Sequence, residues 1–128
     1  MTHESKNLIR LLESGDEKSI ALGLEIFRNN PNKEVEEYLE KQCYLYNKLF
    51  DSNINNIETD HLLIINNPTI ILINRQLTEL PSEIGSLTNL EKLWLSHNQL
   101  TELPPEIGNL TNLEQLWLSD NQLTELPP

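Results

Sequence analysis

Two consecutive stretches of the chain are almost identical: residues 77–99 read LTELPSEIGSLTNLEKLWLSHNQ, and residues 100–122 read LTELPPEIGNLTNLEQLWLSDNQ. A third copy begins at Leu123 and runs to Pro128. A fixed period of this length predicts stacked structural units, because each unit buries its apolar side only against its neighbours. The two complete copies differ at four positions, Ser82/Pro105, Ser86/Asn109, Lys92/Gln115 and His97/Asp120.

The segment LWL of each copy predicts a short strand. Its period of two turns Leu93 and Leu95 to one side and Trp94 to the other. Stacked coils would join these strands in a parallel sheet, with the inward leucines forming a continuous core. A weaker copy precedes the two complete ones, in which Ile70, Leu72 and Leu77 align with Leu93, Leu95 and Leu100.

Polar and conformationally special residues predict the turns. Asn98 and Asn121 follow the strands, where a short amide satisfies unpaired backbone groups. Arg75 stands at the equivalent place in the first coil, so we expect that coil to turn differently, with Asn74 as a partial substitute. Pro81 and Pro104 break the segment that follows. Gly85 and Gly108 are expected to permit a tight bend on the convex side.

The pattern L-x-x-L-x-L-x-x-N-x-L-x-x-L-P-x-x-I-G-x-L-x-x-L resembles the leucine-rich repeat family, and most of all the 23-residue kind of intracellular proteins. The resemblance covers residues 62–128 and implies an α/β solenoid whose short parallel strands line the concave face. It also implies a protein-binding scaffold, of the kind that in some proteins precedes a GTPase, kinase or ligase domain. The matching residues are Leu90, Leu93, Leu95, Asn98, Leu100, Leu103, Ile107, Leu110, Leu113, Leu116, Leu118, Asn121, Leu123 and Leu126.

The first part of the chain has helical periodicity. A first helix is expected to end near Ser14, a second to be capped by Asp16 or Ser14, and a third to run from Asn32 to about Phe50. This part is similar to helical leaders before the repeats of cytosolic bacterial proteins. We predict an α-helical N-terminal cap over residues 1–52, a polar connector and degenerate start over 53–68, and repeats over 69–128, one degenerate, two full and one truncated.

Composition excludes several classes of function. Twenty acidic and nine basic residues give a net charge of −11, which disfavours binding to nucleic acid and to anionic membranes. The single cysteine, Cys43, cannot form a disulfide within the chain and is expected to be a small core residue. Since residues 1–18 contain no signal-peptide pattern and no apolar run reaches about 20 residues, a cytoplasmic location is expected.

Signatures of catalysis are absent from the sequence. It contains no GxSxG, HExxH, CxxC or Gly-rich phosphate loop, so we expect no enzyme activity and no cofactor. The segment from Asp51 fails as a calcium loop, because Asn56 and Leu62 stand where Gly and Glu are needed. His3, His61 and His97 lie on separate segments, so no metal site is predicted.

What remains is the outward face of the predicted strands. Stacking by the repeat period places Ile71, Trp94 and Trp117 in one apolar column. The small side chains of Ser96 and Ser119 lie beside this column and would leave room for a partner. The alternative is that the two tryptophans only stack on each other. The candidate partner-binding residues are Ile71, Lys92, Trp94, Ser96, His97, Gln115, Trp117, Ser119 and Asp120.

Two groups of charges have open interpretations. His97 and Asp120 would form an exposed pair that tunes specificity, or reflect drift between copies. The opposite side carries acidic columns that would act as a solubilising surface, or bind calcium or basic peptides. These columns are Glu79/Glu102/Glu125, Glu83/Glu106 and Glu91/Glu114.

The sequence therefore predicts a module that binds a protein partner through its concave face. A first alternative is a fragment of a larger signalling protein, which a reading frame continuing past Pro128 would support. A second is a structural module that associates with itself, because the last coil, at Leu123, has no polar cap to cover its apolar end.

Overall fold

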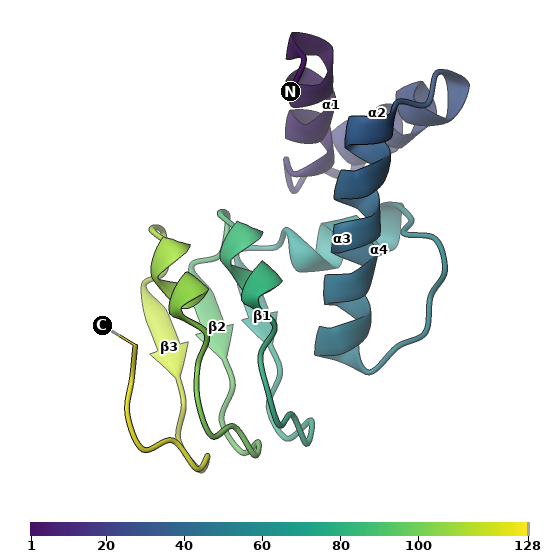
Figure 1. Ribbon diagram of the computed structural model, residues 1–128. Helices are drawn as coiled ribbons and strands as arrows, with labels where there is room; N and C mark the ends of the chain where they lie inside the picture. The colour runs from purple at the N-terminus through teal and green to yellow at the C-terminus, as the bar shows by residue number, and fades with distance from the viewer. Residues whose placement is uncertain (128) are drawn as a thin grey trace.

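The computed structural model describes residues 1–127, so Pro128, the last residue of the predicted truncated repeat, lies outside the described part. Four helices come first, and three short strands alternating with two 3-10 helices follow (Figure 1). None of the helices in the described range is long and apolar enough to cross a membrane. The elements are α1 (His3–Leu12), α2 (Glu17–Asn29), α3 (Lys33–Phe50), α4 (Thr59–Ile65), β1 (Thr69–Ile71), η1 (Ser82–Ser86), β2 (Lys92–Trp94), η2 (Pro105–Asn109) and β3 (Gln115–Trp117).

Side-chain caps set the starts of the first three helices. Thr2, Asp16 and Asn32 each accept a hydrogen bond from the backbone N–H three residues on, which satisfies one of the free donors of the first turn. The caps predicted for α2 and α3 are therefore confirmed. Asp51 is the C-cap of helix α3, and its φ of 50° lies in the left-handed region.

Helix α4 was not foreseen, because the sequence indicated only a connector here. A capping box starts it: the Glu58 side chain accepts from the backbone of His61, and His61 Nδ1 accepts from the Glu58 N–H at 2.9 Å. The helix has seven residues, too few to show a helical period. This contact also gives His61 a structural role.

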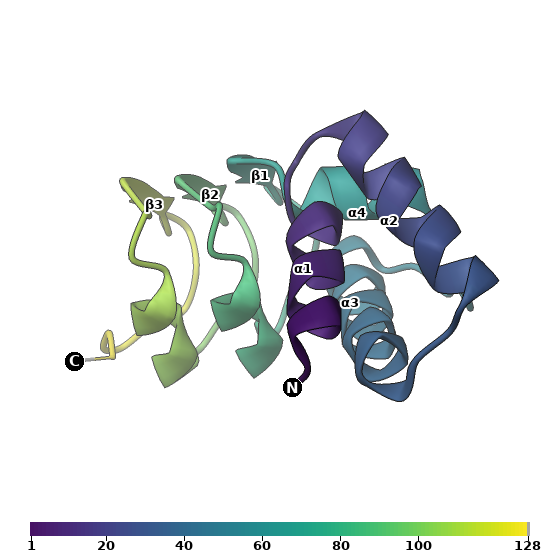
Figure 2. The same cartoon turned by 90° about the horizontal axis from the view of Figure 1, so that it is seen from above.

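The three strands form one parallel sheet in the order β1-β2-β3, while η1 and η2 lie on the opposite side of the stacked coils (Figure 2). Each residue of a strand pairs with the equivalent residue of the next repeat, so that Ile70 lies beside Leu93 and Leu93 beside Leu116. Leu93 and Leu95 are fully buried, as the alternation of LWL predicts. The helices and this sheet fit an α/β repeat fold.

Asparagine side chains join the turns of successive coils. Asn98 Oδ1 accepts from the N–H groups of Arg75 and Leu77 at 2.9 and 3.1 Å, and its Nδ2 donates to the carbonyls of Leu72 and Leu95 at 2.7 and 2.8 Å. The predicted role of this residue is thus confirmed: one amide satisfies backbone groups of two coils.

The first coil turns differently from the others, as expected from Arg75. It has two residues with positive φ, Asn74 at 58° and Gln76 at 59°, whereas the later turns each have one, His97 at 60° and Asp120 at 55°. Arg75 instead lies near the helices, with its guanidinium carbon 6.0 Å from the centre of a Phe50 ring.

The glycines of the repeats have a different role from the predicted one. Neither Gly85 nor Gly108 has a positive φ, so a tight bend does not explain them. A Cβ on Gly85 would lie 2.7 Å from the Glu106 carbonyl oxygen, closer than real Cβ contacts. Gly85 is therefore needed because η1 and η2 approach so closely. At Gly108 a Cβ would meet nothing within 4 Å.

The helices cover the β1 end of the coil stack (Figures 1 and 2). Asn89 Nδ2, in the first complete repeat, donates to the carbonyl of Glu13 at 2.6 Å, and the buried Asn66 amide bonds the carbonyl of Leu62 at 2.9 Å. One cluster of buried residues runs from Leu8 in α1 to Leu110 after η2. Helices and coils thus share a core, and the domain boundaries stay a prediction.

Candidate functional site

The face of the sheet that points away from the core carries the candidate site; we name it the strand face. In-register pairing places Ile71 beside Trp94 and Trp94 beside Trp117. We name these three residues the tryptophan ridge. The predicted column is therefore present. Ile71 is 50% exposed and Trp117 is 47% exposed, while Trp94 between them is half-buried.

The two indoles are stacked. Their ring centroids are 4.2 Å apart and the ring planes differ by 1°. Stacking of this kind contributes about 0.5–1.5 kcal/mol beyond the buried area. It covers one face of Trp94 and leaves the outer face of Trp117 open. The Trp94 Nε1 atom is buried and has no hydrogen-bond partner.

The two serines predicted to leave room for a partner differ in their exposure. Ser96 is only 5% exposed, and its Oγ accepts a hydrogen bond from Ser119 Oγ at 3.0 Å. Ser119 itself is exposed, because no further strand lies over β3 within the described chain. Ser96 is covered by its successor in the stack, so it supports Ser119 and does not offer a contact surface.

His97 and Asp120 occupy equivalent left-handed turn positions in neighbouring coils. The His97 Nδ1 and Asp120 Oδ2 atoms are 3.0 Å apart, and the side chains are 56% and 67% exposed. The predicted exposed pair is therefore present. Such pairs contribute about 0–1 kcal/mol, because water competes for both groups. The pair forms a polar border to the tryptophan ridge, three residues beyond the ends of β2 and β3.

Lys92 and Gln115 form the other border of the strand face. They pair in register with each other, and Lys92 pairs with Thr69 on the preceding strand. Lys92 is half-buried, whereas Gln115 is exposed. The candidate residues thus form one patch: an apolar ridge with a polar border on each side, supported from below by Ser96.

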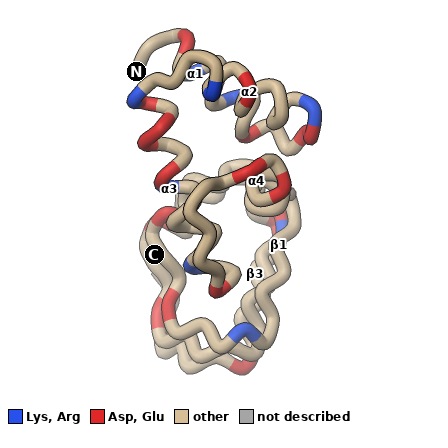
Figure 3. The backbone as a smooth tube through the Cα atoms, turned by 90° about the vertical axis from the view of Figure 1, so that its right-hand side faces the viewer, with Lys and Arg blue, Asp and Glu red and all other residues tan. Residues whose placement is uncertain are grey.

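The acidic columns lie away from the ridge. Figure 3 shows acidic positions recurring along the stacked coils, in keeping with the net charge of −11. Glu79, Glu102 and Glu125 are exposed. Across residues 1–127, no group of three His, Cys, Asp or Glu side chains is placed to hold a metal ion. Burial raises the pKa of the Cys43 thiol, which disfavours the nucleophilic thiolate.

A second feature escaped the sequence reasoning. Tyr38 and Gln42 of α3 line a cavity beneath η1, together with cationic residues of α1. The available signal was Gln42 itself, because it lies on the same buried face of α3 as Val35, Leu45 and Leu49. A polar side chain among apolar ones at helical spacing requires a partner.

Comparison with known proteins identifies the repeats. A family model described as leucine-rich repeats in two copies matches residues 88–128. No curated protein matches the chain. Leucine-rich repeats generally mediate protein–protein interactions and are typically not catalytic. The matched residues include the second complete repeat, with β3 and the turn at Asn121. Residues 88–128 thus match the leucine-rich repeat family, and the parallel strands and asparagine turns of the coils agree with this match.

Proposed function

We propose that the chain binds a protein partner on the strand face, with the tryptophan ridge as the centre of contact. The observation that carries this proposal is the exposure of the ridge: Ile71 and Trp117 each leave about half of a large apolar side chain in water. Aromatic residues in an apolar patch with a polar border are typical of the residues that dominate binding energy.

Internal stacking alone is a weaker explanation. It accounts for Trp94, which lies between two neighbours, but not for the exposed Ile71 or for the exposure of Trp117 within the described residues. The stack also supports binding, because an indole already held in place loses little conformational freedom when a partner covers it.

The borders of the ridge indicate the chemistry of the partner. Gln115, Ser119, Asp120 and His97 offer hydrogen-bonding groups around the apolar centre. The net charge of −11 favours a neutral or basic partner surface over an acidic one. The proposal therefore predicts a partner with an apolar projection bordered by polar or basic groups. A cytoplasmic location of the chain itself is in keeping with its single free cysteine, Cys43.

Site-specific photo-crosslinking tests the proposal. A photo-reactive residue is placed at Ile71 on the strand face or at Leu22 in α2, since both positions are 50% exposed. We expect irradiation to link a partner protein covalently to position 71 and not to position 22. Trp117→Ala in the Ile71 variant should abolish the adduct while circular dichroism shows an unchanged fold. Equal adducts from both positions, or an adduct that survives Trp117→Ala, would contradict the proposal.

Self-association is the second candidate, because within the described residues the coil of β3 leaves apolar residues open. Leu116 and Leu118 are half-buried, whereas their counterparts Leu93 and Leu95 are fully buried, and Leu126 is 62% exposed. Light scattering over a concentration series separates the two ideas. A mass that stays at 14.8 kDa at every concentration excludes self-association and leaves a different protein as the partner.

A further inference from the structure

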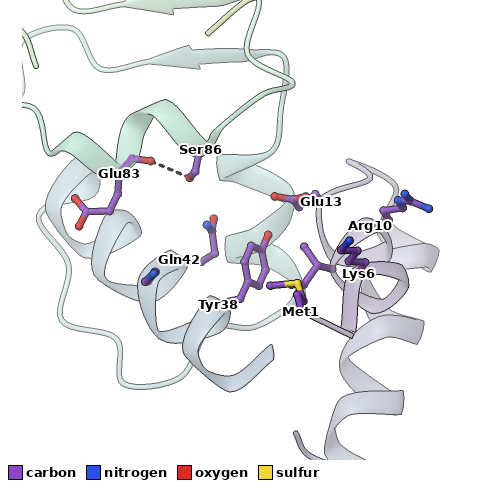
Figure 4. A pocket seen from close by; sticks show the side chains of 10 residues that line it. Met1, Lys6, Arg10, Glu13, Tyr38, Gln42, Glu83 and Ser86 are labelled. Atoms are coloured by element: carbon purple, nitrogen blue, oxygen red, sulfur yellow. Dashed lines mark hydrogen bonds between the residues drawn. The ribbon is translucent and has the colours of Figure 1, made fainter. Parts of the chain in front are cut away.

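A cavity of about 430 Å³ lies where the helices meet the first complete repeat (Figure 4). Helix α1 supplies Lys6, Ile9 and Arg10 on one side, and α3 supplies Tyr38 and Gln42 on another. Its volume is within the range of about 300–1,000 Å³ that is usual for small-molecule sites. The cavity is remote from the strand face, which belongs to the opposite side of the coils.

A buried polar group in this cavity lacks a partner. Gln42 is only 3% exposed, and its Oε1 atom accepts no hydrogen bond within the described residues. The buried Tyr38 hydroxyl, by contrast, meets the Glu13 carboxyl. Because buried polar groups are almost always paired, the unpaired Gln42 Oε1 beside a cavity indicates a missing partner.

The charges around the cavity favour an anion. Lys6, Arg10 and Lys41 line it, and none of them forms an ion pair within the described residues. These are three of the nine cations of a strongly acidic chain. Glu83 lies on the η1 side, and Glu13 lies on the α1 side near the Tyr38 hydroxyl.

The Glu13 carboxyl and the Tyr38 hydroxyl lie together in the wall of the cavity. Burial raises its pKa, and the nearby Tyr38 hydroxyl opposes only part of this effect. Burial and the Glu13 charge together raise the pKa of Tyr38, so its hydroxyl stays protonated and able to donate.

We propose that this cavity binds a small organic anion that also carries a hydrogen-bond donor. The donor group pairs with Gln42 Oε1, the anionic group lies against Lys6 and Arg10, and the apolar body contacts Ile9. This site is independent of partner binding on the strand face.

Titration with matched probes tests the proposal by NMR of the full chain labelled with ¹⁵N. The donor-bearing anions are 4-hydroxyphenylacetate and 6-hydroxyhexanoate; 4-methoxyphenylacetate lacks the donor, and 2-(4-hydroxyphenyl)ethanol lacks the charge. We expect at least one donor-bearing anion to shift the Gln42 side-chain amide signals saturably. The two incomplete probes should bind at least about tenfold more weakly, which corresponds to the loss of one good polar interaction.

Variants distinguish the site from ordinary solvation. Gln42→Leu, followed by the backbone amide signals of the other residues that line the cavity, should abolish binding without lowering the thermal midpoint, because it removes an unpaired buried acceptor. Lys6→Ala with Arg10→Ala should weaken binding about tenfold or more, whereas Lys18→Ala, an exposed cation of α2 outside the cavity, should not.

Three outcomes would overturn the proposal. The first is that no probe shifts the Gln42 amide signals at about 10 mM, which would mean that water alone occupies the cavity. The second is equal binding of complete and incomplete probes. The third is a loss on Lys18→Ala as large as that of the Lys6→Ala/Arg10→Ala variant, which would show general attraction of anions. If Gln42→Leu failed to fold, the α1 variant alone would still decide between these results.

Discussion

Alanine at Gly85 and at Gly108 should change stability in opposite directions. The two glycines occupy the same position in successive repeats, and both lie in 3-10 helices. At Gly85 the added methyl would lie 2.7 Å from the carbonyl oxygen of Glu106 and 3.0 Å from its Cβ. Ordinary contact begins near 3.4 Å, and a backbone oxygen cannot rotate away as a side chain can. Relief therefore requires η1 and η2 to move apart.

The size of the effect follows from this geometry. Forcing one methyl group into a filled space costs about 1–3 kcal/mol. At Gly108 the methyl would meet nothing within 4 Å and φ is not positive, so alanine should stabilise by about 0.4–1 kcal/mol through the unfolded chain. The two variants should therefore differ by about 1.4–4 kcal/mol, a large part of the 5–15 kcal/mol typical of a domain.

Urea denaturation followed by tryptophan fluorescence measures this difference, because Trp94 and Trp117 report on the repeats. Gly85→Ala should lower the midpoint and Gly108→Ala should raise it, both with the slope of the parent chain. If Gly85→Ala is no less stable than Gly108→Ala, then the two 3-10 helices are not in the close contact on which this reasoning depends.

Two further predictions concern the asparagine turns and the Glu13 carboxyl. Asn98→Ala should lower the free energy of unfolding by about 2–4 kcal/mol, because it leaves backbone groups of two coils without partners. Asn121→Ala should lower it less, since water reaches the coil that contains Asn121. Equal midpoints of the two variants in urea would contradict this prediction. Because burial raises the pKa of Glu13 in the folded state, ionisation of this group removes stability as the pH rises from its unfolded value near 4.5 through the folded value. Glu13→Gln should therefore gain on the parent chain between pH 4 and pH 7, and a difference independent of pH would exclude this effect.

The repeat part of the fold could be predicted in detail, because every coil states the same pattern. Register, inward leucines and the turn asparagines all follow from a period that recurs in the sequence. The starts of α2 and α3 were also readable, since Asp16 and Asn32 act on the backbone three residues away. Helix α4 could not be predicted from the sequence, because the element that begins at the Glu58 capping box is too short to show a helical period.

The candidate site was predictable only as a set of positions. In-register stacking of Trp94 on Trp117 follows from the repeat, but the burial of Ser96 does not, since Ser96 and Ser119 are the same letter in the same motif. Their difference arises because one coil lies over Ser96 and, in the described chain, none lies over Ser119. The role of Gly85 is hidden for the same reason: the contact that requires it is with the next coil.

The sequence by itself thus determined the coil, its strand and its turns, because these depend on residues close together in the chain and on a period that repeats them. Tertiary structure alone decided which copies are covered and which are open, and it brought α1, α3 and η1 together around the cavity at Gln42. The physical reason is that burial and unpaired hydrogen-bonding groups depend on neighbours from distant segments, which no local pattern encodes.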